Sequence, residues 1–192
     1  MRRTTSFALS LLLFTAGFAA ADDASLRAGV FHPARPAPDF SLRGSDGTEL
    51  KLSRYRGKVV ILAFGFTSCP DVCPTTLAAL AETRKKLGAQ ATELQVLYIT
   101  VDPDTDSPER MQKYLGSFDP TFLGGTGTAE QLAAVRERYG IAATRKALGT
   151  SYTFSHSSFT YLIDRKGSLR ALMPYGQSSD DYVHDVKILL AP

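Results

Sequence analysis

The chain contains only two cysteines, Cys69 and Cys73, and both lie in the segment FTSCPDVCPTTL. Three residues separate them. If both lie on the first turn of a helix, they share one face, because residues four apart have Cβ atoms about 5–6 Å from each other. Two thiols at that separation can form a disulfide after a modest backbone adjustment, or they can hold one soft metal ion between them. The pair therefore has three candidate uses: a structural disulfide, a redox-active dithiol, or half of a metal site.

The spacing and position of Cys69 and Cys73 favour redox or metal chemistry over a structural role. A disulfide that closes so short a loop restricts little of the unfolded chain, and 192 residues are enough to bury a core without one. A helix N-terminus favours negative charge, so we expect both thiols to have a pKa below the ordinary value. A thioredoxin-type pair has two intervening residues, and the third residue in this chain leaves room for an ion between the sulfurs.

A copper ion held by two thiolates needs a further ligand, and an imidazole suits both of its oxidation states. The chain has three histidines. His32 lies in a proline-rich segment and His184 lies at the edge of the apolar face of the last predicted helix, so we expect neither to bind a metal. His156 directly precedes an apolar strand and is flanked by serines. Its position alone leaves two roles open, a metal ligand or an ordinary loop histidine.

The elements around these residues indicate an α/β fold. Lys58 to Phe66 is an almost continuous apolar run, typical of a central strand covered on both faces. The cysteines follow it directly, and helical spacing then runs from Pro74 to Leu87. The other expected elements are a hairpin over Asp39–Leu52, strands over Leu94–Val101, Phe122–Leu123, Phe159–Ile163 and Ser168–Met173, helices over Pro108–Phe118, Thr128–Tyr139 and Ser178–Leu190, and a loop over Gly140–Gly149. This order predicts a mixed central β-sheet flanked by α-helices, with an N-terminal β-hairpin. In thioredoxin-like domains, the reactive cysteine pair lies at a junction between a strand and a helix.

The N-terminus reads as an export signal. Arg2 and Arg3 precede an apolar stretch, and small residues follow up to Ala21, so we expect residues 1–21 to be a signal peptide. An uncleaved segment that anchors the protein to the inner membrane is the alternative. We expect residues 22–37 to be a flexible lead-in and 38–192 to form one domain. Without the signal, 20 basic residues (22 less the two arginines) stand against 19 acidic ones, which argues against a nucleic-acid partner.

Three blocks of the sequence resemble the Sco/SenC copper chaperones: GKVVILAFGFTSCPDVCPTTL (57–77), YITVDPDTDSPERMQKYLGSFDP (98–120) and YTFSHSSFTYLIDRKG (152–167). The resemblance implies a thioredoxin-like fold, export with frequent membrane tethering, and copper bound by both cysteines and one histidine. Matched by position, these ligands are Cys69, Cys73 and His156. The family commonly has an aspartate where this chain has Ser155, which puts the affinity or the rate of transfer in question. Asp102, in the VDP block, is either close to the site or a turn residue before Pro103.

The resemblance implies a periplasmic metallochaperone, which we favour over an enzyme, that assists assembly of the binuclear copper centre of cytochrome c oxidase. Reduced Cys69 and Cys73 with neutral His156 would bind one copper ion, as Cu(I) or Cu(II). The implied partner is the copper-site subunit of the oxidase, beside other periplasmic copper chaperones or thiol reductases. The alternative is a thiol–disulfide oxidoreductase, in which Cys69 and Cys73 are a redox-active dithiol that reduces the cysteines of that subunit. A peroxidase-like enzyme is a third reading that the CPDVCP loop does not support.

Overall fold

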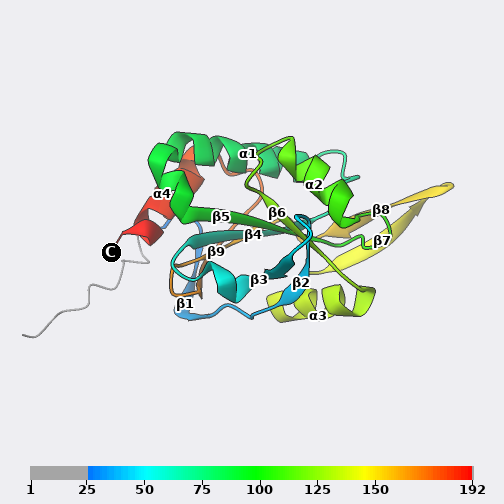
Figure 1. Ribbon diagram of the computed structural model, residues 1–192, viewed down its shortest axis with the longest axis horizontal. Coiled ribbons are helices and arrows are strands. Elements are labelled where there is room, and N and C mark those ends of the chain that lie inside the picture. The colour runs from blue at the N-terminus through cyan, green and yellow to red at the C-terminus, as the bar shows by residue number, and fades with distance from the viewer. Residues whose placement is uncertain (1–25, 192) are drawn as a thin grey trace, which may run out of the picture.

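The computed structural model describes residues 26–191, in which eight strands form one mixed sheet (Figure 1). The strands are β1 (Gly29–Pro36), β2 (Ser41–Gly44), β3 (Glu49–Lys51), β4 (Val59–Gly65), β5 (Leu94–Thr100), β6 (Leu123–Thr126), β9 (Thr160–Ile163) and β10 (Ser168–Met173). Their order across the sheet is β1-β10-β9-β4-β5-β6-β2-β3. The pair β4–β5 and the pair β5–β6 are parallel and the other pairs are antiparallel. The predicted mixed sheet and the hairpin β2–β3 are therefore confirmed.

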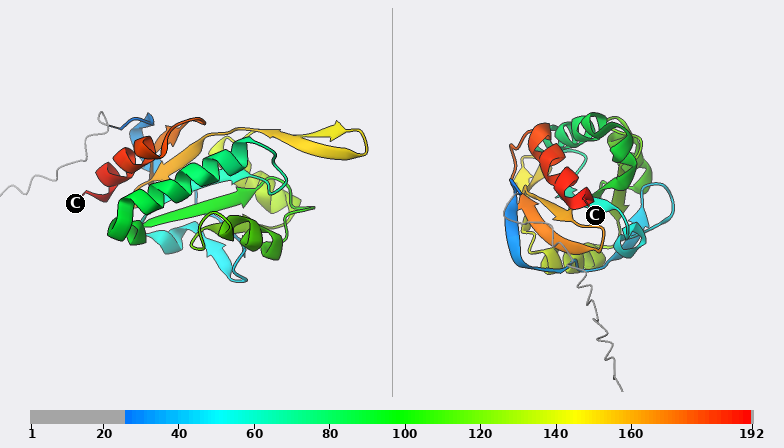
Figure 2. Two further views of the ribbon diagram at one scale, coloured as in Figure 1. Left: turned by 90° about the horizontal axis from the view of Figure 1, so that it is seen from above. Right: turned by 90° about the vertical axis from the view of Figure 1, so that its left-hand side faces the viewer.

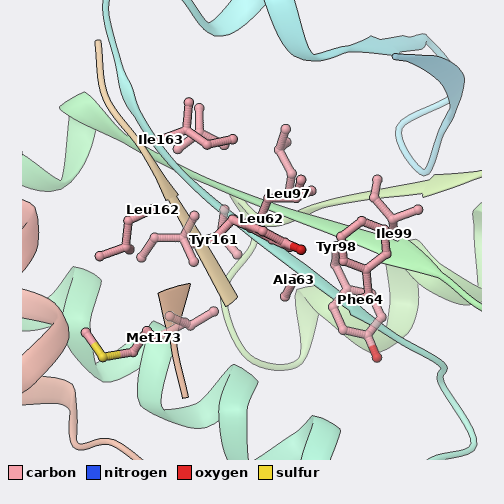
Figure 3. Close-up of a cluster of buried hydrophobic side chains, with 14 of the residues drawn as sticks. Leu62, Ala63, Phe64, Leu97, Tyr98, Ile99, Tyr161, Leu162, Ile163 and Met173 are labelled. Atoms are coloured by element: carbon pink, nitrogen blue, oxygen red, sulfur yellow. The ribbon is translucent and has the colours of Figure 1, made fainter. Parts of the chain in front are cut away.

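The two central strands carry the apolar runs of the sequence. All seven residues of β4 and all seven of β5 are buried, and the strands pair in register from Val59 opposite Leu94 to Gly65 opposite Thr100. Figure 3 shows this part of the core, where Ala63 and Phe64 of β4 lie beside Tyr98 and Ile99 of β5. A strand buried on both faces is typical of a sheet covered by helices on each side.

Helices cover both faces of the sheet. Four α-helices are present in the described part of the chain, namely α1 (Val72–Leu87), α2 (Pro108–Gly116), α3 (Ala129–Tyr139) and α4 (Ser179–Leu190). Helices α1, α2 and α4 lie on one face and α3 lies on the other (Figure 1). Two short 3-10 helices, Leu52–Tyr55 and Gly88–Glu93, join strands to their neighbours. The hydroxyl of Thr128 accepts a hydrogen bond from the backbone of Gln131, whose side chain bonds back to Thr128, so this capping box begins α3 at the predicted position.

The predicted loop over Gly140–Gly149 is wrong, because this region forms a hairpin. Strands β7 (Ala143–Leu148) and β8 (Ser151–His156) pair with each other as a separate two-stranded sheet. Gly149, at φ +57°, supplies the left-handed backbone that the turn needs. The hairpin extends away from the rest of the domain, at the end opposite the C-terminus (Figure 2). Because most of β7 is exposed, it lacks the alternation of apolar and polar residues that predicts a strand.

The expectation of a flexible lead-in over residues 22–37 is wrong for its second half. Strand β1 pairs with β10 at the edge of the sheet, where prolines are tolerated because a free edge needs fewer backbone donors. Just before it, the buried carboxylate of Asp185 accepts hydrogen bonds from the backbone of Arg27 and Ala28, at 2.8 and 2.9 Å. The predicted signal segment, residues 1–21, lies outside the described residues. Within residues 26–191, no helix combines the length and the apolar character that a membrane crossing requires.

Candidate metal centre

The cysteine pair lies where β4 ends and α1 begins. Helix α1 starts at Val72, so Cys73 lies in its first turn while Cys69 precedes it. The side chain of Asp71, the residue before the helix, makes no capping hydrogen bond. Instead, the backbone N–H of Cys73 donates to the sulfur of Cys69, with a nitrogen–sulfur distance of 3.4 Å. The Cys69 sulfur thus satisfies one of the unpaired amides at the helix N-terminus. The two cysteines do not share one face of a helix, and both are free thiols.

His156 reaches Cys73 from the far end of the sequence. It is the last residue of β8, and its Nε2 lies 3.6 Å from the sulfur of Cys73. Its Nδ1 lies 2.8 Å from the carbonyl oxygen of Ser157. Because a carbonyl can only accept, Nδ1 carries the proton and the Nε2 lone pair faces Cys73. The ring also packs edge-on against Phe66, with 6.0 Å between ring centroids, so the imidazole is fixed in orientation.

The separation of this sulfur and this nitrogen fits a shared metal ion. In a roughly tetrahedral site of a first-row ion, bond lengths of about 2.3 Å to sulfur and 2.0 Å to nitrogen place the two ligand atoms about 3.5 Å apart. The distance between Cys73 Sγ and His156 Nε2, 3.6 Å, is close to this value. A thiolate and an imidazole are also a donor set that copper accepts. The contact in the metal-free protein, a thiol proton directed at Nε2, would give way to the ion without a large movement of either group.

The third predicted ligand, Cys69, is held at the start of helix α1. In residues 26–191, no three side chains of His, Cys, Asp or Glu are grouped as a ready metal site. The Cys69 sulfur accepts from the helix amide and its side chain also interacts with that of Cys73. Cys69 is half-buried whereas Cys73 is 3% exposed. His184 contacts Asp185 on α4, and His32 is exposed on β1. The structure thus brings Cys73 into contact with both other predicted ligands, His156 and Cys69, and it places Cys69 three residues before the helix begins.

Burial determines the protonation states of Cys73 and His156. The predicted low pKa of the Cys73 thiol is wrong. Burial raises the pKa of this thiol to about 12, although a hydrogen bond from Tyr98 works in the opposite direction. The effect of the helix N-terminus is smaller than the cost of placing a thiolate in the core. Burial also lowers the pKa of His156, while its bond to Ser157 acts to raise it. Near neutral pH, the metal-free site therefore holds a neutral thiol and a neutral imidazole.

The loop after β5 anchors both halves of the site. The carboxylate of Asp106, 1% exposed, accepts hydrogen bonds from the backbone N–H and the hydroxyl of Thr67, at 3.0 and 2.6 Å, two residues before Cys69. The carboxylate of Asp102, 2% exposed, accepts a bond from the hydroxyl of Tyr152 on β8, at 3.0 Å. Asp102 was predicted to lie near the site or to serve a turn, and the structure shows the turn, since its carbonyl accepts from the backbone of Asp106. Sequence reasoning missed Asp106 and Tyr152, because nothing in a single sequence marks an anchor between distant segments.

Gly65 and Tyr98 complete the surroundings of Cys73, and both were missed. A methyl group at position 65 would overlap the hydroxyl of Tyr98 and would lie 2.7 Å from the sulfur of Cys73. Tyr98, Cys73 and His156 line the same small cavity, together with Ala63. The available signal was a glycine inside a buried strand, which often marks a close approach of other groups.

Ser155, which stands where the family commonly has an aspartate, is exposed. Successive residues of a strand point to opposite sides, so Ser155 and His156 project from opposite sides of β8. In this chain the carboxylate of Asp102, in the loop after β5, accepts a hydrogen bond from the strand that carries His156.

Known proteins similar to this chain agree on its classification. The "SCO2-like protein RC0895" of Rickettsia conorii is 36% identical over 132 residues, which are 67% of this chain and 64% of that protein. The chain thus spans somewhat less than two thirds of the length of this relative. The copper-bound structure of Bradyrhizobium japonicum ScoI superposes with a TM-score of 0.74 at 31% identity, covering 79% of this chain and 98% of that one. The apo Sco1 protein of Thermus thermophilus gives a TM-score of 0.77 at 34% identity, covering 86% and 97%. These likenesses confirm the thioredoxin-like fold. Because the SCO1/SenC family model also matches residues 31–191, the chain belongs to the SCO1/SenC family.

Proposed function

We propose that this protein is an exported copper metallochaperone. It binds one copper ion through Cys69, Cys73 and His156, and it assists assembly of the binuclear copper centre of cytochrome c oxidase. The single observation that carries the proposal is the 3.6 Å separation of Cys73 Sγ and His156 Nε2. Family membership supports it, and so does the copper that is bound in the structure of Bradyrhizobium japonicum ScoI.

Each proposed ligand has a defined task. His156 offers Nε2 without first losing a proton, because Nδ1 carries the proton and donates it to the carbonyl of Ser157. Cys73 must release its thiol proton to solvent when the ion binds, since the thiolate is the form that coordinates copper. Cys69, whose sulfur accepts from the helix amide and whose side chain already interacts with Cys73, would supply the second thiolate. Oxidation of the two cysteines to a disulfide would remove two of the three ligands, so the redox state would control binding.

The test is a titration of purified, reduced protein with Cu(I) and, separately, with Cu(II). We expect one ion per chain. Loss of a partner that merely orients a ligand usually weakens a metal about 10- to 100-fold, so loss of His156 itself should cost at least about 100-fold. His184→Ala is the matched control, because His184 lies on α4, where its ring contacts Asp185. If His156→Ala binds copper as tightly as His184→Ala does, the proposed ligand set is wrong.

A second function, thiol–disulfide exchange, is favoured by the unequal exposure of the cysteines. Cys69 is half-buried and Cys73 is buried. Cys69 would attack a partner's disulfide, forming a mixed disulfide and releasing one partner thiol. Cys73 would then displace the second partner thiol and leave an internal disulfide. His156→Ala distinguishes the two functions, because it should abolish copper binding but retain exchange with a disulfide substrate.

We also propose the location and partners that fit this role. The protein acts in the periplasm, with residues 1–21 as its export signal or as an inner-membrane anchor, and it meets the copper-site subunit of the oxidase and other periplasmic copper chaperones or thiol reductases. Fractionation of cells that express the full chain tests the location. Recovery in the periplasmic extract indicates a cleaved signal, whereas recovery with inner membranes indicates an anchor. Recovery in the cytoplasm contradicts export.

A further inference from the structure

A buried tyrosine hydroxyl lies against the sulfur of Cys73 in a space that Gly65 leaves open. Tyr98 belongs to β5 and is 2% exposed. A Cβ atom at position 65 would overlap the Tyr98 hydroxyl and would lie 2.7 Å from the Cys73 sulfur. The Tyr98 hydroxyl and the Cys73 sulfur therefore both lie against the backbone of Gly65. Figure 3 shows the Tyr98 ring in the core next to Ala63. The hydroxyl and the sulfur therefore meet where no solvent competes.

The Tyr98 hydroxyl has a weak partner in the metal-free protein. It donates to the carbonyl oxygen of Phe66 at 3.3 Å, which is long for a bond between two oxygens. The hydroxyl proton can rotate about the bond to the ring, and the Cys73 sulfur is the second acceptor within its reach. A hydrogen bond from Tyr98 is also among the interactions that favour the charged form of Cys73.

We propose that Tyr98 is a positioning residue for Cys73: its hydroxyl donates a hydrogen bond to the sulfur and thereby tunes both the bond from sulfur to copper and the dithiol–disulfide equilibrium. The copper part of this role rests on the proposed function, and the disulfide part does not. A sulfur that has given up its proton accepts hydrogen bonds better than a thiol does. Hydrogen bonds around a cysteine ligand are one of the means by which proteins tune the properties of bound copper.

The same bond stabilises the reduced protein. In the dithiol the Cys73 sulfur shares its proton with His156 Nε2, which leaves more negative charge on this sulfur than a disulfide sulfur carries, so it accepts the bond from Tyr98 better. The bond to Tyr98 therefore stabilises the dithiol form more than the disulfide form. A single hydrogen bond contributes about 0.5–1.5 kcal/mol, so its loss should move the equilibrium about two- to tenfold toward the disulfide.

The test compares Tyr98→Phe with Tyr114→Phe. Both changes remove one hydroxyl from two neighbouring rings, whose centroids are 6.4 Å apart. The Tyr114 hydroxyl is buried and has no hydrogen-bond partner within the described residues, so its removal costs no such bond. The first measurement equilibrates each copper-free protein with reduced and oxidised glutathione. Oxidation transfers two electrons and two protons from the cysteines to glutathione disulfide, which becomes two glutathione molecules.

We expect Tyr98→Phe to be about two- to tenfold more oxidised than wild type at equal glutathione ratios, and Tyr114→Phe to match wild type. The second measurement is the sulfur-to-Cu(II) charge-transfer absorption. Without the hydrogen bond the sulfur electrons lie higher in energy, so the band of Tyr98→Phe should move to longer wavelength. A structural role alone would not move this band.

The inference is overturned if the glutathione equilibrium of Tyr98→Phe equals that of Tyr114→Phe. It is also overturned if copper binds both variants and their bands coincide. If wild type binds no copper, the proposed function fails, and the glutathione measurement still decides the role of Tyr98. Circular dichroism establishes that both variants are folded before either comparison is made.

Discussion

Replacing Gly65 with alanine tests whether the space beside Cys73 is as tight as the structure indicates. The new methyl would overlap the Tyr98 hydroxyl and would lie 2.7 Å from the Cys73 sulfur, closer than carbon and sulfur approach without a bond. Gly65 does not have a positive φ, so the backbone itself accepts alanine and the whole penalty is steric. Neither neighbour can retreat easily, because Tyr98 and Cys73 are 2% and 3% exposed.

The magnitude follows from overpacking of a buried site, which costs about 1–3 kcal/mol. For a chain of this length, that corresponds to a fall in Tm of about 2–12 °C. Because the methyl pushes the Cys73 sulfur from its place opposite His156 Nε2, copper affinity should also fall at least about tenfold, as when a residue that orients a ligand is lost. Calorimetry gives the Tm, and competition with a chelator of known affinity gives the affinity.

Gly116→Ala is the matched control for this change. A methyl at Gly116, the last residue of α2, would meet nothing within 4 Å, and we expect unchanged copper binding and equal or slightly higher stability. Gly65→Ala in the Tyr98→Phe background should cost about 1 kcal/mol less than it does in wild type, because one of the overlapping atoms is gone. The reasoning is refuted if Gly65→Ala melts and binds copper as Gly116→Ala does.

Three further predictions concern the proton on Cys73 and the anchors of the site. Burial raises the pKa of the Cys73 thiol to about 12, so copper must displace the thiol proton when it binds. The release of this proton should raise copper affinity by about tenfold per pH unit between pH 7 and 9; a flat profile contradicts a protonated thiol. Asp106→Ala removes the acceptor for the backbone N–H and hydroxyl of Thr67. The free energy of unfolding, measured with urea, should fall by about 3 kcal/mol; a fall below about 1 kcal/mol would mean that the bonds of Asp106 to Thr67 are not needed. Tyr152→Phe leaves the buried Asp102 carboxylate without the hydroxyl that donates to it. Amide exchange in β8 should therefore quicken about five- to 150-fold, which corresponds to a loss of about 1–3 kcal/mol; unchanged exchange would show that the bond does not hold the hairpin.

The parts of the fold that sequence reasoning located correctly are those where burial imposes a pattern. The apolar runs around Val59–Gly65 and Leu94–Thr100 became the two central strands. Strand β10 has the predicted bounds, Ser168–Met173, and it alternates between buried and partly buried residues. Helix α3, which Thr128 caps, lies where the sequence predicts a helix over Thr128–Tyr139. In each case the local sequence and the position relative to the core agree.

The parts that were missed are those whose structure depends on distant segments. Strand β1 forms because β10 offers its edge, although its own prolines argue against a strand. The hairpin β7–β8 has few buried residues to give it a pattern. The pKa of Cys73 depends on how deeply the fold buries the thiol, which the helix-terminus argument did not include. The pairing of His156 with Cys73 spans 83 positions. Its position in the sequence left its role open, and the family resemblance identified it as a ligand.

The unequal state of the three proposed ligands has a consequence for the transfer of copper. Cys73 and His156 are already at the separation that one ion requires, and Asp106 and Asp102 hold the loop and the hairpin that carry the site. Cys69, whose sulfur bonds to the amide at the helix N-terminus, is the half-buried cysteine. In the proposed transfer, a partner thiol therefore reaches the ion from the Cys69 side. On this argument the buried pair holds the ion in place while Cys69 is replaced, so release begins at the ligand that is only half-buried.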